Sequence, residues 1–132
     1  MNRLVLAGLR SPLHGLFDGG TIGLRYLSTG RGEVTLPVGY VRCGTDLVVL
    51  VAGSSKKMWW RHFRTSKPVD VWWQGAWRPT SGRVCAFGTP EYLGPAIAYR
   101  NKHPRMRTSR DPFVLITAPV VLDATPQSSA RI

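Results

Sequence analysis

Alternation of apolar and polar residues, interrupted by glycine-rich turns, is the feature that most constrains how this chain folds. From residue 21 the sequence TIGLRYLS places Ile22, Leu24 and Tyr26 on one face of an extended segment and ends at the turn STGRGE. The segment VTLPVGYVR, residues 34–42, alternates in the same way, and CGTD turns the chain into the apolar run LVVLVAG, residues 47–53. A period of two indicates β-strands, and an uninterrupted apolar run indicates a strand buried on both faces. We therefore predict one strand followed by a hairpin.

The rest of the chain adds two helices and three strands. The segment SSKKMWWRHFRTS, residues 54–66, opens with a serine that can cap a helix and predicts a short helix. Residues 69–88, VDVWWQGAWRPTSGRVCAFG, predict two strands joined by a tight turn at QGA. Residues 89–104 predict a second helix, with Thr89 as its cap and Pro90 at its first position. Residues 111–122, DPFVLITAPVVL, predict the last strand.

Short turns between the strands favour antiparallel pairing, and about six such strands can close into a small barrel. We predict an α+β, mainly β fold, a six-stranded antiparallel split β-barrel with peripheral helices, as a single domain over residues 1–122. Residues 1–18 predict an amphipathic helix that packs on the domain or, as the alternative, touches a membrane surface. Residues 123–132 form a polar tail. Pro37 has no amide hydrogen, so we expect its strand at an edge or interrupted there.

The charge balance points to an anionic partner. Eighteen Lys and Arg against seven Asp and Glu give a formal net charge of +11. Such a surface attracts polyanions, and the guanidinium group suits phosphate and carboxylate in particular. Arg31 lies in the TGRG turn, and two further clusters contain no acid: Lys56, Lys57, Arg61, Arg64 and Lys67 around the first predicted helix, and Arg100, Lys102, Arg105, Arg107 and Arg110 further on.

Ser54 and Ser55 stand where a buried strand gives way to the predicted helix. Backbone amides at such a point can bind an anion, although the chain has no GxxxxGK phosphate loop. The alternative is an ordinary solvated basic surface. The chain also has five tryptophans, Trp59, Trp60, Trp72, Trp73 and Trp77. They can stack on a planar ring, but adjacent side chains point in different directions, so we expect one of each neighbouring pair in the core.

Other kinds of site find little support in the sequence. Cys43 and Cys85 have no metal-ligand spacing, and we interpret them as packed thiols in a reducing cytoplasm. His14, His62 and His103 have no Cys or carboxylate partners at metal spacing, so we predict no metal site. The acids are scattered, and no nucleophile elbow or carboxylate pair is visible. The catalytic residues of an enzyme are therefore unknown, and its chemistry would belong to a cofactor.

Four motifs follow one another between residues 13 and 119: LRYLSTGRG, TLPVGYV, LVVLVAGSSKKMWWRHFRTSKPVDV and RTSRDPFVLITAP. They contain a Thr-x-Gly-Arg turn, a proline-containing strand, a strand that ends in small residues before a Trp-bearing helix, and an Arg before the last strand. Together they resemble the deazaflavin-dependent nitroreductase family of actinobacteria, a branch of the split β-barrel flavin and deazaflavin oxidoreductases.

The resemblance implies binding of coenzyme F-420, whose phosphate and oligoglutamate tail are anionic. It implies hydride transfer from the reduced coenzyme to a small organic acceptor such as a quinone, an enone or a nitro compound. The implied cofactor-binding residues are Arg31, Pro37, Val38, Ser54, Ser55, Lys56, Lys57, Trp59, Trp60 and Arg61. Those implied for the acceptor pocket are Tyr99 and Arg110.

The sequence departs from the family's pattern where GEV directly follows TGR, which shortens the loop, and where YRNKHPRMRTSRD replaces tyrosines before the last strand. The alternatives are a protein that binds FMN or no cofactor, or a non-catalytic basic protein that binds nucleic acid or an anionic membrane surface. Nucleic acid is disfavoured, because no RNP, zinc-finger or helix-turn-helix motif is present. Strand edges, or aromatic surface on the tryptophan-rich hairpin, are compatible with pairing into a homodimer. We expect a cytoplasmic protein, with peripheral membrane contact through the N-terminal segment as the alternative.

Overall fold

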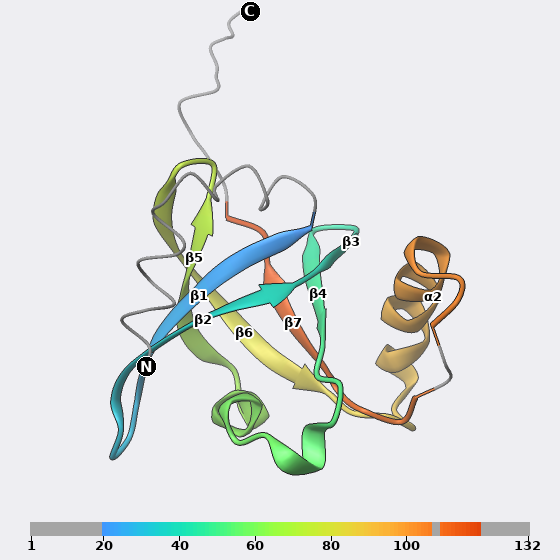
Figure 1. Cartoon of the computed structure of the whole chain (residues 1–132), viewed down its shortest axis with the longest axis horizontal. Helices are drawn as coiled ribbons and strands as arrows, with labels where there is room; N and C mark the ends of the chain where they lie inside the picture. Colours follow the sequence, from blue (N-terminus) through green and yellow to red (C-terminus); the bar gives the residue numbers. More distant parts are fainter. Residues whose placement is uncertain (1–19, 107–108, 120–132) are drawn as a thin grey trace, which may run out of the picture.

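The computed structural model describes residues 20–106 and 109–119 of the chain. The helix predicted over residues 1–18 and the tail predicted over residues 123–132 lie outside the described residues, as does Arg107. The strands are β1 (Thr21–Ser28), β2 (Gly32–Gly39), β3 (Val41–Cys43), β4 (Asp46–Leu50), β5 (Lys67–Trp73), β6 (Ala76–Cys85) and β7 (Phe113–Thr117), and the helices are η2 (Ser54–Lys56), η3 (Trp59–Arg64), η4 (Pro90–Tyr92) and α2 (Leu93–Lys102) (Figure 1).

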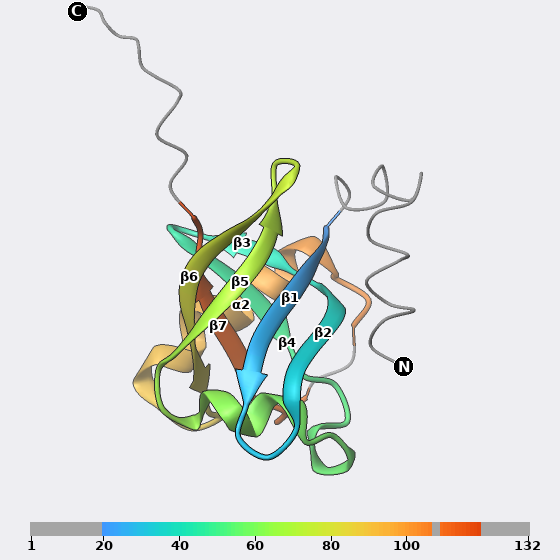
Figure 2. The same ribbon diagram turned by 90° about the vertical axis from the view of Figure 1, so that its left-hand side faces the viewer.

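All these strands belong to one antiparallel sheet in the order β2-β1-β5-β6-β7-β4-β3. Figure 2 shows that the sheet curls, and β2 and β3 form its two edges. Within the described residues these two edges do not pair, so the sheet is a half-barrel. The prediction of a mainly β, antiparallel fold with peripheral helices is confirmed. The expectation of six strands closed into a barrel is wrong, since the sheet has seven strands and stays open.

The seventh strand arises because the strand predicted over residues 34–42 is really two strands. The break is at Tyr40, whose N–H donates to the carbonyl of Gly20 at 2.8 Å. Before the break, β2 pairs with β1 along its whole length. After it, β3 forms the predicted hairpin with β4. One extended segment thus supplies both edges of the sheet, and Pro37 lies on an edge strand, as predicted.

The β5–β6 hairpin turns where the QGA segment predicted it. Gln74 and Gly75 have φ values of 52° and 83°. Positive φ at both central residues defines a type I′ turn, whose twist matches that of the flanking strands. Beside the turn, Trp72 and Trp77 stand opposite each other with ring centroids 5.4 Å apart.

The concave side of the half-barrel holds the larger core. η3 lies across the lower end of the sheet in Figures 1 and 2 and inserts Phe63, which is 0% exposed. Phe63 packs against Gly82 of β6, where an added Cβ would lie 3.2 Å from the Cδ1 atom of the ring. The glycine therefore leaves the space that the ring needs. The other buried members of this core are Ile22, Leu24, Tyr26, Leu47, Val49, Val51, Val69, Val71, Val114 and Ile116.

The single helix predicted over residues 54–66 is wrong, because the segment forms two short 3-10 helices. Lys57 between them is extended, with φ −119° and ψ 145°, so helical hydrogen bonding cannot continue through it. Beyond this break, Trp59 and Trp60 both pack against the concave core, whereas one of them was expected there. Of the second tryptophan pair, Trp73 packs against this core.

α2 covers the convex side of the sheet beside β3 and β4 (Figure 1). Buried residues of the strands meet the helix in a second core, formed by Val48, Cys85, Phe113 and Leu115 with Tyr92, Ala96 and Tyr99. Because the concave core uses the alternate residues of the same strands, β4 is buried on both faces, as its apolar run predicted. Cys43 and Cys85 are free thiols that pack in this second core. In the described ranges, none of the helices has the length and apolar character needed to cross a bilayer.

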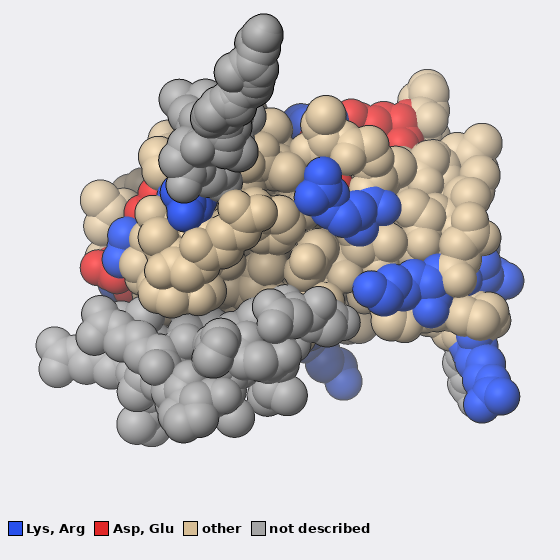
Figure 3. Space-filling model, turned by 90° about the horizontal axis from the view of Figure 1, so that it is seen from above, with Lys and Arg blue, Asp and Glu red and all other residues tan. Residues whose placement is uncertain are grey.

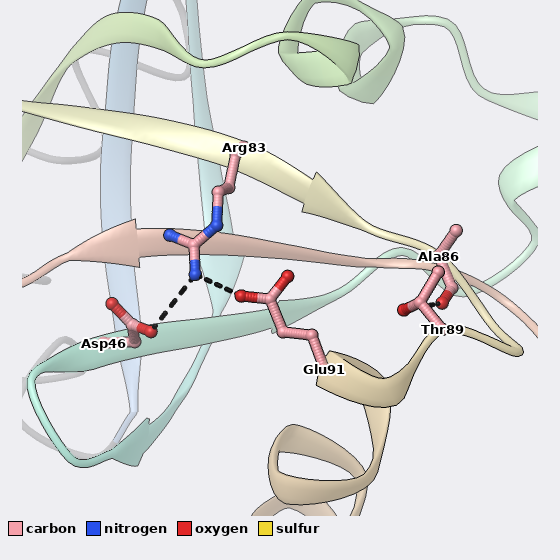
Figure 4. Close-up of polar contacts among 5 residues, drawn as sticks. All are labelled: Asp46, Arg83, Ala86, Thr89 and Glu91. Carbon is pink, nitrogen blue, oxygen red and sulfur yellow. Dashed lines mark hydrogen bonds and ion pairs between the residues drawn. The ribbon is translucent and has the colours of Figure 1, made fainter.

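Arg83 on β6 ties the start of the helical segment to the sheet (Figure 4). Its guanidinium forms an ion pair with Glu91 of η4 and lies 3.9 Å from a carboxylate oxygen of Asp46 on β4. The hydrogen bond with Glu91 raises the pKa of Arg83. Thr89 has the extended backbone of a helix cap, as predicted, but its hydroxyl donates to the carbonyl of Ala86 at 2.8 Å instead of capping the helix.

Candidate functional site

A groove of about 550 Å³ lies between the edge strand β2 and the segment that joins η2 to η3. We call it the β2 groove, and it is lined by Arg31, Val34, Leu36, Lys57, Met58 and Trp59. It brings together Arg31, Lys57 and Trp59, three residues that the family resemblance implied for a cofactor. Val34, Leu36 and Met58 supply the apolar wall of the site and were not predicted from the sequence.

The apolar wall exists because β2 is the edge of an open sheet. Val34 and Leu36 stand opposite Tyr26 and Leu24 of β1, so they face the concave side. In a closed barrel a further strand would cover them, whereas here they are half-buried. Apolar surface beside two cations suits a planar, partly apolar anion.

Trp59 is held at the groove by β1. The hydroxyl of Tyr26 donates to the carbonyl of Trp59 at 3.2 Å, and the Tyr26 ring stacks on His62 with centroids 4.4 Å apart. Burial raises the pKa of Tyr26, against the opposing effect of the Arg31 charge, so the phenol keeps its proton at neutral pH. Phe63 packs edge-on against both Tyr26 and Trp59.

Arg31 and Lys57 determine the charge of the groove. Among the described residues that line it there is no Asp or Glu. His62, stacked on Tyr26, adds no third charge at neutral pH, because burial and the Lys67 charge lower its pKa. The β2 groove therefore has two positive charges and favours an anionic ligand.

Asp111 fixes the loop that leads from β4 to Lys57. Its carboxylate accepts hydrogen bonds from the amides of Gly53 and Ser54, both at 3.1 Å. It also accepts from the hydroxyls of Ser54 at 2.7 Å and Ser109 at 3.0 Å. The Ser54 hydroxyl is the largest cause that holds the pKa of Asp111 below its usual range. An ionised carboxylate thus fixes this loop at neutral pH.

This clamp occupies the donors that the sequence analysis assigned to an external anion. The amides at the end of the strand were expected to bind phosphate at a helix N-terminus. In the structure the amides of Gly53 and Ser54 and the Ser54 hydroxyl bind Asp111. Ser55 and Lys56 are exposed and do not line the β2 groove.

The role of Asp111 was not predicted from the sequence, because it depends on a long-range strand pairing. Asp111 and the loop residue Ser54 are 57 positions apart in the chain. They meet because β4 and β7 pair, with Leu50 opposite Phe113. The sequence did indicate that the backbone amides after the buried strand require hydrogen-bond acceptors. It did not indicate which acidic residue would accept these hydrogen bonds.

Trp60 and Arg61 belong to a different surface. The indole N–H of Trp60 donates to the carbonyl of Ser54 at 3.0 Å, which braces the loop. The guanidinium groups of Arg61 and Arg64 lie 5.6 and 5.5 Å from the centroid of the Trp60 ring. Trp60 and Arg64 help to line a separate cavity of about 450 Å³, on the side of Cys85.

The remaining implied residues also lie outside the β2 groove. Pro37 is exposed and Val38 is half-buried, both further along β2. Tyr99 lines a cavity beside α2. The guanidinium of Arg110 lies 5.7 Å from the ring centroid of Phe87. In the described part of the chain, the residues implied for the acceptor and those implied for the cofactor therefore do not line one cavity.

Comparison with known sequences finds no match, either among models of protein families or among curated proteins. The site itself consists of two cations, an indole and an apolar wall around one groove.

Proposed function

We propose that this protein is a deazaflavin-dependent oxidoreductase that binds coenzyme F-420 in the β2 groove. The observation that carries the proposal is that Arg31, Lys57 and Trp59, each implied by the family resemblance, line one groove of about 550 Å³. That volume is within the range of about 300–1,000 Å³ that small-molecule sites occupy. In the proposed reaction, the reduced coenzyme passes a hydride to a small organic acceptor.

The residues of the groove fit the two kinds of surface on this coenzyme. Arg31 and Lys57 match its anionic phosphate and tail, since a guanidinium can offer two parallel N–H groups and an ammonium acts as a point charge. Val34 and Leu36 offer apolar surface to the deazaflavin ring, and the indole of Trp59 can stack on it.

The contribution of the chain to this reaction is binding and orientation. The hydrogen bonds of Tyr26 and Asp111 hold the walls of the groove in place before a ligand arrives. Less conformational entropy is then lost on binding, and the reacting groups are better oriented. The hydride chemistry itself is supplied by the coenzyme.

Equilibrium titration with coenzyme F-420, and separately with FMN, tests the proposal when tryptophan fluorescence is followed at moderate salt. We expect saturable quenching by F-420 and weaker binding of FMN. Absence of saturable binding by F-420 contradicts the proposal. Preferential FMN binding would indicate that the β2 groove is a cofactor site for FMN and not for F-420.

Lys57→Glu and Lys56→Glu form a matched pair, because the charge change is the same but only Lys57 lines the groove. We expect Lys57→Glu to weaken F-420 binding at least about tenfold, because a short-range attraction becomes a repulsion. Lys56→Glu should weaken it about threefold or less, because Lys56 does not line the groove and solvent and salt screen a charge that acts from further away. Equal losses of F-420 affinity in the two variants would indicate that only the overall charge of the surface attracts the coenzyme. A generic polyanion bound with steep salt dependence, without F-420 binding, would favour the nucleic-acid alternative.

A further inference from the structure

A second cavity, of about 590 Å³, lies where α2 ends. We call it the α2 pocket, and it is lined by Leu50 of β4, Tyr99 of α2 and residues 102–106. It shares no lining residue with the β2 groove. The two cavities are therefore separate candidate sites.

Among the residues that the structure describes, the cations of the α2 pocket have no acidic partner. Lys102 and Arg105 line the pocket, and no Asp or Glu of the described residues does. Most of the described acids are engaged elsewhere: Asp46 and Glu91 with Arg83, Asp70 with Arg25, and Asp111 with the loop amides. Figure 3 shows Lys and Arg side chains gathered at the right-hand end of the molecule, the end where α2 lies in Figure 1.

The partial negative charge at the end of the helix compensates only part of this positive charge. A helix C-terminus carries roughly half a negative charge, which a basic residue in the last turn such as Lys102 complements. Arg105 lies beyond the helix. Two full positive charges therefore face roughly half a negative one, and the potential in the pocket stays positive.

The rest of the lining is largely apolar and is anchored in the second core. Leu50 and Met106 offer hydrocarbon surface. The ring of Tyr99 packs against Phe113 and His103, with centroid distances of 5.8 and 5.0 Å. Burial raises the pKa of Tyr99, so its phenol is neutral at pH 7 and can donate a hydrogen bond.

We propose that the α2 pocket binds a small amphiphilic anion, with a phosphate or carboxylate group at Lys102 and Arg105 and an apolar chain or ring against Leu50 and Met106. An inorganic anion would leave the apolar wall in contact with water, and a neutral apolar molecule would leave the cations unmatched. The site therefore selects ligands that have both parts. This inference is independent of the coenzyme proposed for the β2 groove.

Octyl phosphate, inorganic phosphate and octanol are the probes that test this selectivity. Each is titrated into the ¹⁵N-labelled full chain below the concentration at which octyl phosphate forms micelles, and amide shifts are followed. With octyl phosphate we expect saturable amide shifts at Leu50, Tyr99, Lys102, His103, Arg105 and Met106, since Pro104 has no amide hydrogen. Octyl phosphate should bind at least about tenfold more tightly than either other probe, because each of these lacks one of the two contacts. Equal binding of inorganic phosphate, or shifts spread over the whole surface, would overturn the proposal.

The double variant Lys102→Glu/Arg105→Glu and its control Lys56→Glu/Arg61→Glu change the net charge equally. All four side chains are exposed, so both variants should keep the fold, which circular dichroism checks. We expect the first variant to weaken octyl phosphate binding at least about tenfold and the control about twofold or less. Equal losses in the two variants would overturn the site. F-420 binding by the first variant should stay near that of the unmodified protein.

Vesicles distinguish a soluble ligand from a lipid headgroup in a bilayer. The protein is sedimented with vesicles of phosphatidylcholine, with and without phosphatidylglycerol. Octyl phosphate binding without vesicle binding, or competition of octyl phosphate with the vesicles for the same amides, supports a pocket for one amphiphile. Vesicle binding without any binding of monomeric octyl phosphate would overturn the proposal. It would indicate that the basic residues contact an anionic membrane surface instead.

Discussion

The β2 groove and the α2 pocket have similar volumes and two cations each, but the chain holds their basic segments in different ways. The segment that carries Lys57 is tied to the rest of the molecule by Asp111, by the hydroxyl of Tyr26 and by the buried ring of Phe63. Residues 103–106 contain no buried side chain. Their backbone is held by amide hydrogen bonds of 2.9 and 3.0 Å to the carbonyls of residues 99 and 103.

This difference shows that charge does not reveal which basic segment presents a preformed site. Both segments are rich in Lys and Arg, yet among the described residues only the first has long-range hydrogen bonds and a fully buried side chain. A segment held before binding loses less conformational entropy when a ligand arrives. The following three variants test how far the anchors of the two segments differ, from the largest expected effect to the smallest.

Phe63→Ala should have the largest effect on stability. It removes a ring that is 0% exposed and leaves a cavity beneath η3, so we expect the free energy of unfolding to fall by about 3–5 kcal/mol. Met106→Ala, in the α2 pocket, should cost under about 1 kcal/mol because its side chain is only half-buried. Urea unfolding at pH 7 measures both values. Similar losses would mean that the two segments are equally anchored.

Asp111→Asn should lower the free energy of unfolding by about 1–2 kcal/mol at pH 7. This value is at the low end for hydrogen bonds to a charged group, because Asp111 is only half-buried. The folded protein holds the pKa of Asp111 below its usual value. Its contribution is therefore fully present above the unfolded pKa of about 3.9 and is lost as the pH falls through the lowered pKa. Urea unfolding from pH 7 to the acid limit should show the variant and the unmodified protein converging.

For Asp111→Asn we expect a change in F-420 affinity opposite in sign to the one that net charge alone would produce. Loss of a negative charge near the groove would by itself strengthen the binding of an anion. If Asp111 positions Lys57, F-420 binding should instead weaken about threefold or more, which the fluorescence titration measures. Asp46→Asn, on the convex side, serves as the charge-matched control. Tighter F-420 binding by Asp111→Asn would show that the clamp does not position the groove.

Tyr26→Phe should have the smallest effect of the three. It removes the hydrogen bond to the carbonyl of Trp59, and we expect a loss of about 0.5–1.5 kcal/mol. Tyr99→Phe is its counterpart at the α2 pocket, where the hydroxyl has no hydrogen-bond partner among the described residues. That substitution should change the stability by less than about 0.5 kcal/mol. A larger effect at Tyr99 than at Tyr26, measured by urea unfolding, would reverse the comparison.

The local structure was largely predictable, because its causes lie within a few residues of each other. Alternation located β1, β5 and β6, and the QGA segment located a turn with two positive φ values. The break between β2 and β3 was not predictable. It depends on the hydrogen bond from Tyr40 to Gly20, two residues that are not neighbours in sequence.

The candidate site was predictable in part. Motifs around Arg31, Lys57 and Trp59 named three residues that line one groove. The apolar wall of Val34 and Leu36 could not be assigned, because it is exposed only where the half-barrel stays open. Tyr99 is separated from these residues because it packs with α2 on the opposite, convex side of the sheet.

By itself, the sequence determined the positions of most strands and turns, the double-sided burial of β4 and the excess of positive charge, since these follow from short-range periodicity and composition. The tertiary structure alone decided which charges meet. Pairing of β4 with β7 brings Asp111 to amides 57 positions away, so an internal carboxylate takes the donors expected to bind a ligand. Sequence patterns cannot reveal such a pairing, because the contacts that select it come from the whole core.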